Sequence, residues 1–314
     1  MFSFFKPKGT IDFMGHNKLS MIVSVVLTIA SIVLLATRGL NFGLDFTGGT
    51  LVEVQFEQNV QLKEVRHAMA THGFPDVVAQ NFGAKGDILL RMKPSKSANA
   101  EQVGDKVMGV LKTLDKNVQM RRIEFVGPSV GNDLAEQGGL AIFAALGMIL
   151  IYVAIRFEWR FAVGAVLALA HDTILTLGLF SLLRIQFDLT VVAGLLTLIG
   201  YSLNDTIVVS DRIRENFRKI RKGAPRDIIN ASITQVFSRT IITSATTAMV
   251  LAVLFFLGGN LIHSFATAML FGIIVGTHSS IYVASSLALW LGVKKEDFMP
   301  KVIEKEGADQ KPLM

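Results

Sequence analysis

The chain has 314 residues, of which 51% are apolar and 18% charged, and its mean hydropathy is +0.49. This composition excludes an ordinary water-soluble globular protein, in which about a quarter of the residues are charged. The absence of cysteine excludes disulfides, cysteine–zinc sites and thiol catalysis. A net charge of +6 is compatible with a nucleic-acid partner, but the charges first have to be placed relative to a membrane.

Six apolar segments are long enough to cross a bilayer as helices. A hydrocarbon core of about 30 Å needs roughly 20 helical residues, because backbone polar groups cannot stay unpaired in lipid. The first segment follows basic residues, as a signal peptide does, but its apolar run of 18 residues predicts an uncleaved anchor. We place the spans at Leu19–Ala36, Gly138–Ile155, Phe161–Leu183, Leu189–Val209, Ile241–Leu257 and Ser264–Leu291.

The distribution of Lys and Arg orients these spans. One side of the predicted membrane carries 18 basic residues, whereas the short loops on the other side carry only Arg184. The positive-inside rule therefore places in the cytoplasm the N-terminus (1–18), the basic loop (210–240) and the tail (292–314), and both chain ends with them. The loop at 210–240 is basic enough to attract anionic lipid headgroups.

The long segment 37–137 is then exported. Its central part, Leu40–Gln137, holds 11 basic and 12 acidic residues, so the surplus positive charge is cytoplasmic and we expect no nucleic-acid partner. Periodicity predicts four strands and two helices in the order β-α-β-β-α-β, at Thr50–Phe56, Gln61–Thr71, Val77–Phe82, Asp87–Met92, Ala100–Leu114 and Val118–Val126. This order is typical of the ferredoxin-like α+β fold, which implies no particular function.

Two glycine-containing motifs border the exported domain. Asp45, Gly48 and Gly49 follow the first span, where a tight turn is the simplest interpretation. The run Gly127-Pro-Ser-Val-Gly131 matches the GxSxG pattern of hydrolases, but a membrane span follows it instead of a packed helix, so we reject an esterase. Nucleotide-binding and metal-binding motifs are absent from the sequence, and we predict no enzyme activity, no cofactor and no metal.

Two carboxylates lie inside predicted spans. Asp172, preceded by His171, is midway along the third span, and Asp205, preceded by Asn204, lies in the last third of the fourth. Intramembrane acids usually mark ion pathways, although an interhelical hydrogen bond alone would also explain each of them.

Arg239 is the natural partner of Asp205. We place Arg239 at the cytoplasmic edge of the fifth span, and Asp205 about 9 Å below that edge at 1.5 Å per residue. A permanent ion pair would keep Asp205 charged, so a proton carrier needs the pair to open during a cycle. The alternative is that Arg239 only anchors its span.

In the sixth span, Gly272 and Gly276 form a GxxxG pattern that favours close helix packing.

The run from Gly200 to Asn216, GYSLNDTIVVSDRIREN, resembles the fourth-span signature of the SecF family, the smaller membrane subunits of the bacterial SecDF protein-export complex. Three further pieces are similar to motifs of that family: the turn at Asp45–Gly49, the pair His171-Asp172, and Ser238-Arg239-Thr240. With six spans and one exported domain, the resemblance covers nearly the whole chain.

The resemblance implies a function. It predicts an inner-membrane subunit that acts with SecD beside the SecYEG channel and uses the proton-motive force to help complete the export and release of preproteins. On this reading protons are the coupling ion, Asp205 is the proton-responsive carboxylate, Arg239 is its switchable partner, and Asn204 and Asp172 lie in the polar path. Two alternatives stay open: a proton-coupled exporter of small molecules or lipids from the related resistance-nodulation-division superfamily, and a scaffold subunit that conducts nothing.

Overall fold

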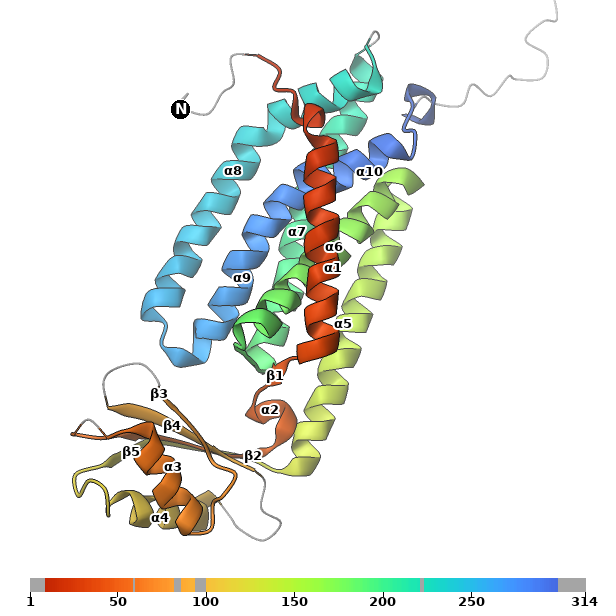
Figure 1. Cartoon of the computed structure of the whole chain (residues 1–314). Helices are drawn as coiled ribbons and strands as arrows, with labels where there is room; N and C mark the ends of the chain where they lie inside the picture. Colours follow the sequence, from red (N-terminus) through yellow and green to blue (C-terminus); the bar gives the residue numbers. More distant parts are fainter. Residues whose placement is uncertain (1–8, 59, 82–85, 94–99, 221–222, 299–314) are drawn as a thin grey trace, which may run out of the picture.

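The computed structural model describes residues 9–58, 60–81, 86–93, 100–220 and 223–298. They form a bundle of long helices with a small sheet domain at one end (Figure 1). Six helices are long and apolar enough to cross a membrane. They are α1 (Asn17–Arg38), α5 (Pro128–Arg156), α6 (Trp159–Leu183), α7 (Leu189–Lys219), α8 (Pro225–Leu257), and a composite helix made of α9 (Asn260–His278), a π-helical segment (Ser279–Ala284) and α10 (Ser285–Trp290). The predicted class of six membrane helices with one inserted α+β domain is confirmed.

Three of these helices extend well beyond the predicted spans. α5 begins at Pro128 instead of at Gly138. α7 continues past Val209 to Lys219, and α8 begins at Pro225 instead of near Ile241. The extension of α7 is stabilised by Glu215, which forms ion pairs with Arg212 and Lys219 one turn away on either side. Most of the predicted basic loop at 210–240 is therefore helix, whereas the depth of each helix in the bilayer stays a prediction.

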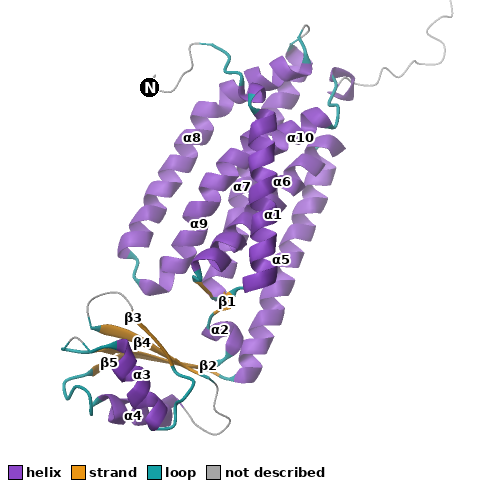
Figure 2. Ribbon diagram, in the orientation of Figure 1, coloured by secondary structure: helices purple, strands orange, loops and turns teal. Residues whose placement is uncertain are grey.

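The sheet domain is formed by the residues between α1 and α5 in the sequence and lies at one end of the bundle (Figure 2). Its four strands have the order β3-β4-β2-β5, every neighbouring pair is antiparallel, and α3 and α4 pack on one face. This is the ferredoxin-like arrangement that the sequence predicts. The elements are β2 (Gly49–Gln55), α3 (Leu62–Thr71), β3 (Val78–Asn81), β4 (Asp87–Met92), α4 (Ala100–Leu111) and β5 (Gln119–Val126). The predicted end of β3, Phe82, lies outside the described residues.

The composite helix α9–α10 occupies the middle of the bundle. α9 packs against α6, α7 and α8, and the π-helical segment also touches α1. Two glycines make the α7 contact possible. A Cβ added at Gly272 would overlap the side chain of Leu198, and one at Gly276 would press on Ser202 at 3.2 Å. The predicted role of this GxxxG pair in close helix packing is confirmed.

We expect Gly272→Ile to destabilise the bundle. The added side chain must displace Leu198, and overpacking of this kind costs about 1–3 kcal/mol. Thermal unfolding of the purified protein in detergent or nanodiscs measures the effect as a lower melting temperature. Gly147→Ile on α5 is the matched control, because a Cβ at Gly147 has no neighbour within 4 Å. Equal melting temperatures for the two variants would contradict the packing argument.

Candidate functional site

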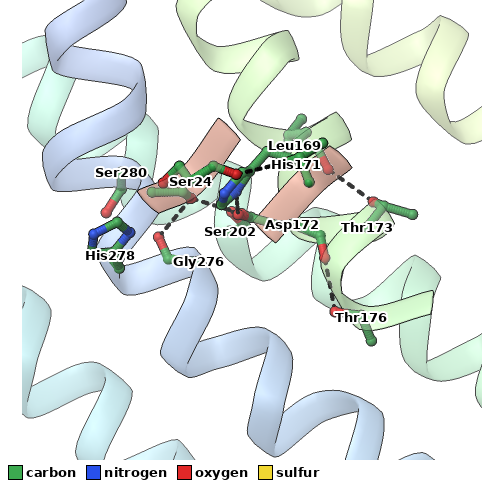
Figure 3. Close-up of polar contacts among 12 residues, drawn as sticks. Ser24, Leu169, His171, Asp172, Thr173, Thr176, Ser202, Gly276, His278 and Ser280 are labelled. Atoms are coloured by element: carbon green, nitrogen blue, oxygen red, sulfur yellow. Dashed lines mark hydrogen bonds and ion pairs between the residues drawn. The ribbon is translucent and has the colours of Figure 1, made fainter. Parts of the chain in front are cut away.

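Asp172 lies on α6 at the centre of a buried polar network (Figure 3), and its residue is 1% exposed. Its Oδ2 accepts hydrogen bonds from Ser202 Oγ of α7 at 2.6 Å and from Ser279 Oγ of the π-helical segment at 2.8 Å. Its Oδ1 accepts a third from the neighbouring His171 Nδ1 at 2.9 Å. The carboxylate therefore joins three membrane helices, and every one of its hydrogen bonds comes from a neutral or switchable donor.

Asp205 lies on α7, and its residue is 7% exposed. Ser280 Oγ, also from the π-helical segment, donates to its Oδ2 at 2.8 Å. The next residue on α7, Thr206, is buried, and so is Thr240 on α8, and neither hydroxyl has a hydrogen-bond partner among the described residues. Asp205 thus sits in a polar pocket of hydroxyl groups between α7, α8 and the composite helix.

Asn204 and Arg239 do not point into this buried network. Both side chains are exposed on the outside of the chain, although their neighbours Asp205 and Thr240 are buried, because each residue of a helix turns by about 100° from the last. Arg239 forms no ion pair with Asp205 within the described structure. The structure therefore brings Asp172 and Asp205 to the same central helix but does not bring Arg239 onto Asp205. The switchable pair stays a prediction.

The sequence analysis missed the serines that hold the two acids. Ser202, Ser279 and Ser280 are each at most 1% exposed, and a lone serine in an apolar span gives little signal. One signal was available. The run Thr277-His278-Ser279-Ser280 places four consecutive polar residues inside an otherwise apolar span. A polar stretch of that length in lipid needs partners on other helices.

The Asp45–Gly49 turn forms the joint between the bundle and the sheet domain. The short strands β1 (Asn41–Phe42) and β6 (Gln186–Phe187) pair in parallel, and the single helical turn α2 (Leu44–Thr47) follows. Asp45 Oδ2 accepts a hydrogen bond at 2.8 Å from the backbone N of Leu189, the first residue of α7. The carboxylate therefore ties the chain after α1 to the start of the helix that carries Asp205.

The two glycines of this turn have backbone angles that favour glycine over other residues. Gly48 and Gly49 have φ of +64° and +125°, which side chains with a Cβ rarely adopt. A Cβ at Gly49 would also overlap the backbone oxygen of Met92 in β4. The tight-turn interpretation is right for both glycines, but the contact between Asp45 and α7 could not be read from the local sequence.

Within the part of the chain that the structure describes, no group of three or more His, Asp or Glu side chains could hold a metal ion. The prediction of no cofactor rests on the sequence alone. The buried network consists of carboxyl, imidazole and hydroxyl groups. Its carboxyl and imidazole groups can bind and release protons, and its hydroxyl groups can donate and accept hydrogen bonds.

The joint contains a second carboxylate, Asp188, which caps α7 by accepting hydrogen bonds from Val191 N at 3.0 Å and Thr190 Oγ1 at 2.6 Å. Burial raises the pKa of this carboxyl, the two hydrogen bonds oppose the rise, and the nearby charge of Asp45 adds to it. A raised pKa means that the folded protein holds this proton to higher pH than the unfolded chain does. The associated stabilisation is present at low pH and is lost as pH rises through the folded pKa.

We therefore expect Asp188→Asn to flatten the stability profile in the acidic range. Asparagine keeps a capping oxygen but carries no charge, so the variant should lose less stability than the wild type as pH rises from about 4, the ordinary pKa of an aspartate. Melting temperatures measured across that range test this. Asp105→Asn, an exposed acid on α4, is the control and should leave the profile unchanged. If the melting temperature of Asp188→Asn varied with pH as that of the wild type does, the Asp188 carboxyl would not titrate in this pH range.

Comparisons with known proteins agree with these features. Residues 106–294 match the family described as protein export membrane protein SecD/SecF, C-terminal, and residues 33–60, which include Asp45, Gly48 and Gly49, match the SecD/SecF GG motif. The chain is 56% identical to the protein translocase subunit SecF of Vibrio alginolyticus over 98% of both chains. It is 52% identical to that of Escherichia coli O157:H7, over 96% of this chain and 94% of the relative.

Solved structures of SecDF have the same fold. The crystal structure of SecDF from Thermus thermophilus, a translocon-associated membrane protein, superposes with a TM-score of 0.82 at 36% identity over 90% of this chain. A second structure, SecDF in its super-membrane-facing form, gives 0.68 at 36% identity over 91%. The chain corresponds to 39% of the length of each of these SecDF chains. Together with its six membrane helices and inserted α+β domain, these likenesses show that the chain belongs to the SecF family of multi-pass protein translocase subunits.

Proposed function

We propose that this protein is the proton-driven SecF-type accessory subunit of a bacterial Sec export system. It acts with a SecD partner beside the SecYEG channel in the inner membrane, with both termini in the cytoplasm, and promotes late translocation and release of preproteins. The observation that carries the proposal is that two acids, Asp172 and Asp205, are buried in the bundle and held by serine hydroxyls.

Serine is a suitable partner for a carboxyl group that changes its charge. A hydroxyl donates to a carboxylate, and after rotation it accepts from the protonated acid, so both forms are hydrogen-bonded without moving the backbone. A lysine or arginine in the same position would favour only the charged form. An intramembrane acid with hydroxyl partners and no fixed cation is therefore able to take up and release protons as part of a cycle.

A SecD partner would cover the exposed side chains of Arg239 and Asn204. An arginine or asparagine facing hydrocarbon is costly, about 2.5–3.5 kcal/mol for arginine at the bilayer centre. The exposed side of α7 that carries Asn204 is otherwise small, with Ala193, Thr197 and Gly200 at helical spacing, and small residues let a second helix approach closely. We infer that this side of α7 and the adjoining Arg239 of α8 face SecD, whose equivalent makes up much of the longer SecDF chains.

The joint at Asp45 offers a route from the acids to the exported domain. Asp45 holds the first residue of α7, and Asp205 lies further along the same helix. One charge that crosses 100 mV releases about 2.3 kcal/mol, enough to bias a two-state domain equilibrium by roughly fifty-fold.

The two alternatives make different demands. A small-molecule or lipid exporter needs a substrate site in large exported domains, whereas the exported part here is a single small ferredoxin-like domain. Near-complete alignment with protein translocase subunits also favours protein export. A scaffold subunit needs the fold but no titrating acid. The scaffold and the proton-driven subunit are separated by experiment.

We expect Asp205→Asn to abolish the contribution of this protein to export. The amide keeps the size and the hydrogen bonding of the carboxyl group but cannot titrate. The measurement is periplasmic accumulation of a secreted reporter in cells whose only copy is the variant, with protein levels checked by immunoblotting. Asp105→Asn is the matched control and should export normally. Full export by Asp205→Asn at normal levels would contradict proton coupling and leave the scaffold.

We expect Arg239→Lys to reduce export without abolishing it. Lysine keeps the positive charge but loses the planar guanidinium that holds a carboxylate through two parallel hydrogen bonds. The same reporter assay measures the loss. Arg226→Lys, an exposed arginine of the same helix that pairs with Asp12, controls for general effects of the exchange. Unchanged export by Arg239→Lys would indicate that the residue only anchors α8 at the membrane boundary.

A further inference from the structure

Four consecutive residues at the end of α9 each contact a different helix. Thr277 Oγ1 lies 2.7 Å from Ser244 Oγ of α8, and His278 Nε2 lies 2.8 Å from Ser20 Oγ of α1. Ser279 donates to Asp172 of α6 and Ser280 to Asp205 of α7. We call Thr277–Ser280 the junction segment. It links four of the other five membrane helices, and its two serines connect the two buried acids through one peptide bond.

The junction segment lies where an α-helix changes into a π-helix. α9 ends at His278, and the π-helical segment begins at Ser279. A π-helix has a wider turn, with hydrogen bonds between residues five apart, and such single turns occur mostly at functional sites. Ser285 Oγ reaches back to the backbone oxygen of Ser280, five residues before it, at 3.3 Å. The backbone that carries the two acid-binding serines therefore departs from regular α-helix.

Each of these serines has a second acceptor within reach. Ser279 Oγ lies 3.1 Å from the backbone oxygen of Gly276, and Ser280 Oγ lies 3.0 Å from that of Thr277. When a carboxyl group changes charge, its serine can turn to the backbone oxygen of its own helix without losing all its hydrogen bonds. The rotation changes the hydrogen bonding of the same turn that holds the other serine.

We propose that Ser279 and Ser280 are positioning residues that couple Asp172 to Asp205 through the π-helical turn, so that a change at one acid alters how the other is held. This inference rests on the proposed function, because it matters only if the acids exchange protons. The titratable and charged groups that face the segment or its two acids are His171 and Asp172 of α6, Asp205 and Tyr201 of α7, Arg239 of α8, whose charge acts on Asp205, and the segment's own His278 together with Tyr282. α1 and α8 also contribute the hydroxyls of Ser20 and Ser244.

The test uses the full-length protein with its SecD partner in inverted membrane vesicles that import a preprotein. The variants are Ser279→Ala, Ser280→Ala and the double variant. Ser280→Thr keeps the hydroxyl group. Ser286→Ala is the control, because Ser286 is fully buried on the same composite helix but, among the described residues, its hydroxyl hydrogen-bonds only to Met14 Sδ, at 3.9 Å. The readouts are the proton-dependent rate of translocation as a function of pH and the melting temperature of the complex.

We expect each alanine variant to lose about tenfold of the proton-dependent rate and to shift its pH profile, since each loses a hydrogen bond to a charged group. Because either change breaks the same link, the double variant should lose no more than the worse single variant, whereas independent losses would multiply to about a hundredfold. Ser280→Thr should restore the rate and the profile, and Ser286→Ala should match the wild type.

Two results overturn the inference while leaving the proposed function intact. One is wild-type rate and pH profile in both alanine variants when Asp205→Asn is inactive. The other is a multiplicative loss in the double variant that follows the melting temperature and that threonine does not rescue, because this identifies two independent structural hydrogen bonds. Normal translocation by Asp205→Asn is a different failure, which removes the proposed function itself and the coupling with it.

Discussion

A carboxylate in the hydrocarbon core of a bilayer must find its hydrogen-bond donors inside the protein, because lipid supplies none. This constraint explains the arrangement of the bundle. Asp172 and Asp205 lie on different helices, and both are satisfied by one central helix that supplies Ser279 and Ser280. That helix has to approach α7 closely, and Gly272 permits the approach by leaving room for Leu198. The packing of the bundle and the chemistry of its acids therefore depend on the same contacts.

The same constraint divides each polar helix into two faces. On α7 the buried face carries Asp205 and Ser202, and the exposed face carries Asn204 among small residues. On α8, Thr240 is buried and Arg239 is exposed. Asn204 and Arg239 are exposed on the described part of the bundle, which is the reason to expect a second membrane subunit beside them. The chain matches 39% of the longer SecDF chain, in agreement with this expectation.

The sheet domain is attached to the helical bundle by polar contacts at one end of the bundle. β1 pairs with β6, and Asp45 holds the start of α7. Gly49 brings β2 against β4 where any side chain would collide with the backbone of Met92. This joint connects the helix that carries Asp205 directly with the first strand of the sheet. A movement of α7 therefore has a short covalent and hydrogen-bonded path to the sheet domain.

Much of the architecture follows from the sequence alone. Hydropathy identifies six helices because backbone groups in lipid must be paired within each segment, and alternation of apolar residues identifies the strands of the ferredoxin-like domain. The two acids also stand out, because a charge in an apolar span is rare. Helix ends are less well predicted: α7 and α8 continue beyond the predicted spans, and the ion pairs that stabilise the end of α7 do not contribute to hydropathy.

Only the tertiary structure identifies the residues that hydrogen-bond to Asp172 and Asp205. Ser202, Ser279 and Ser280 become their partners because α6, α7 and the composite helix meet in the bundle. The rotation of each helix about its axis decides that Asp205 and Thr240 are buried while Asn204 and Arg239 are exposed. Asp45 reaches Leu189 because two segments that are 144 residues apart in the chain meet at the end of the bundle. Sequence determines which residues must be buried or paired, since that cost is local, but the identity of each partner depends on distances between helices that only the folded chain defines.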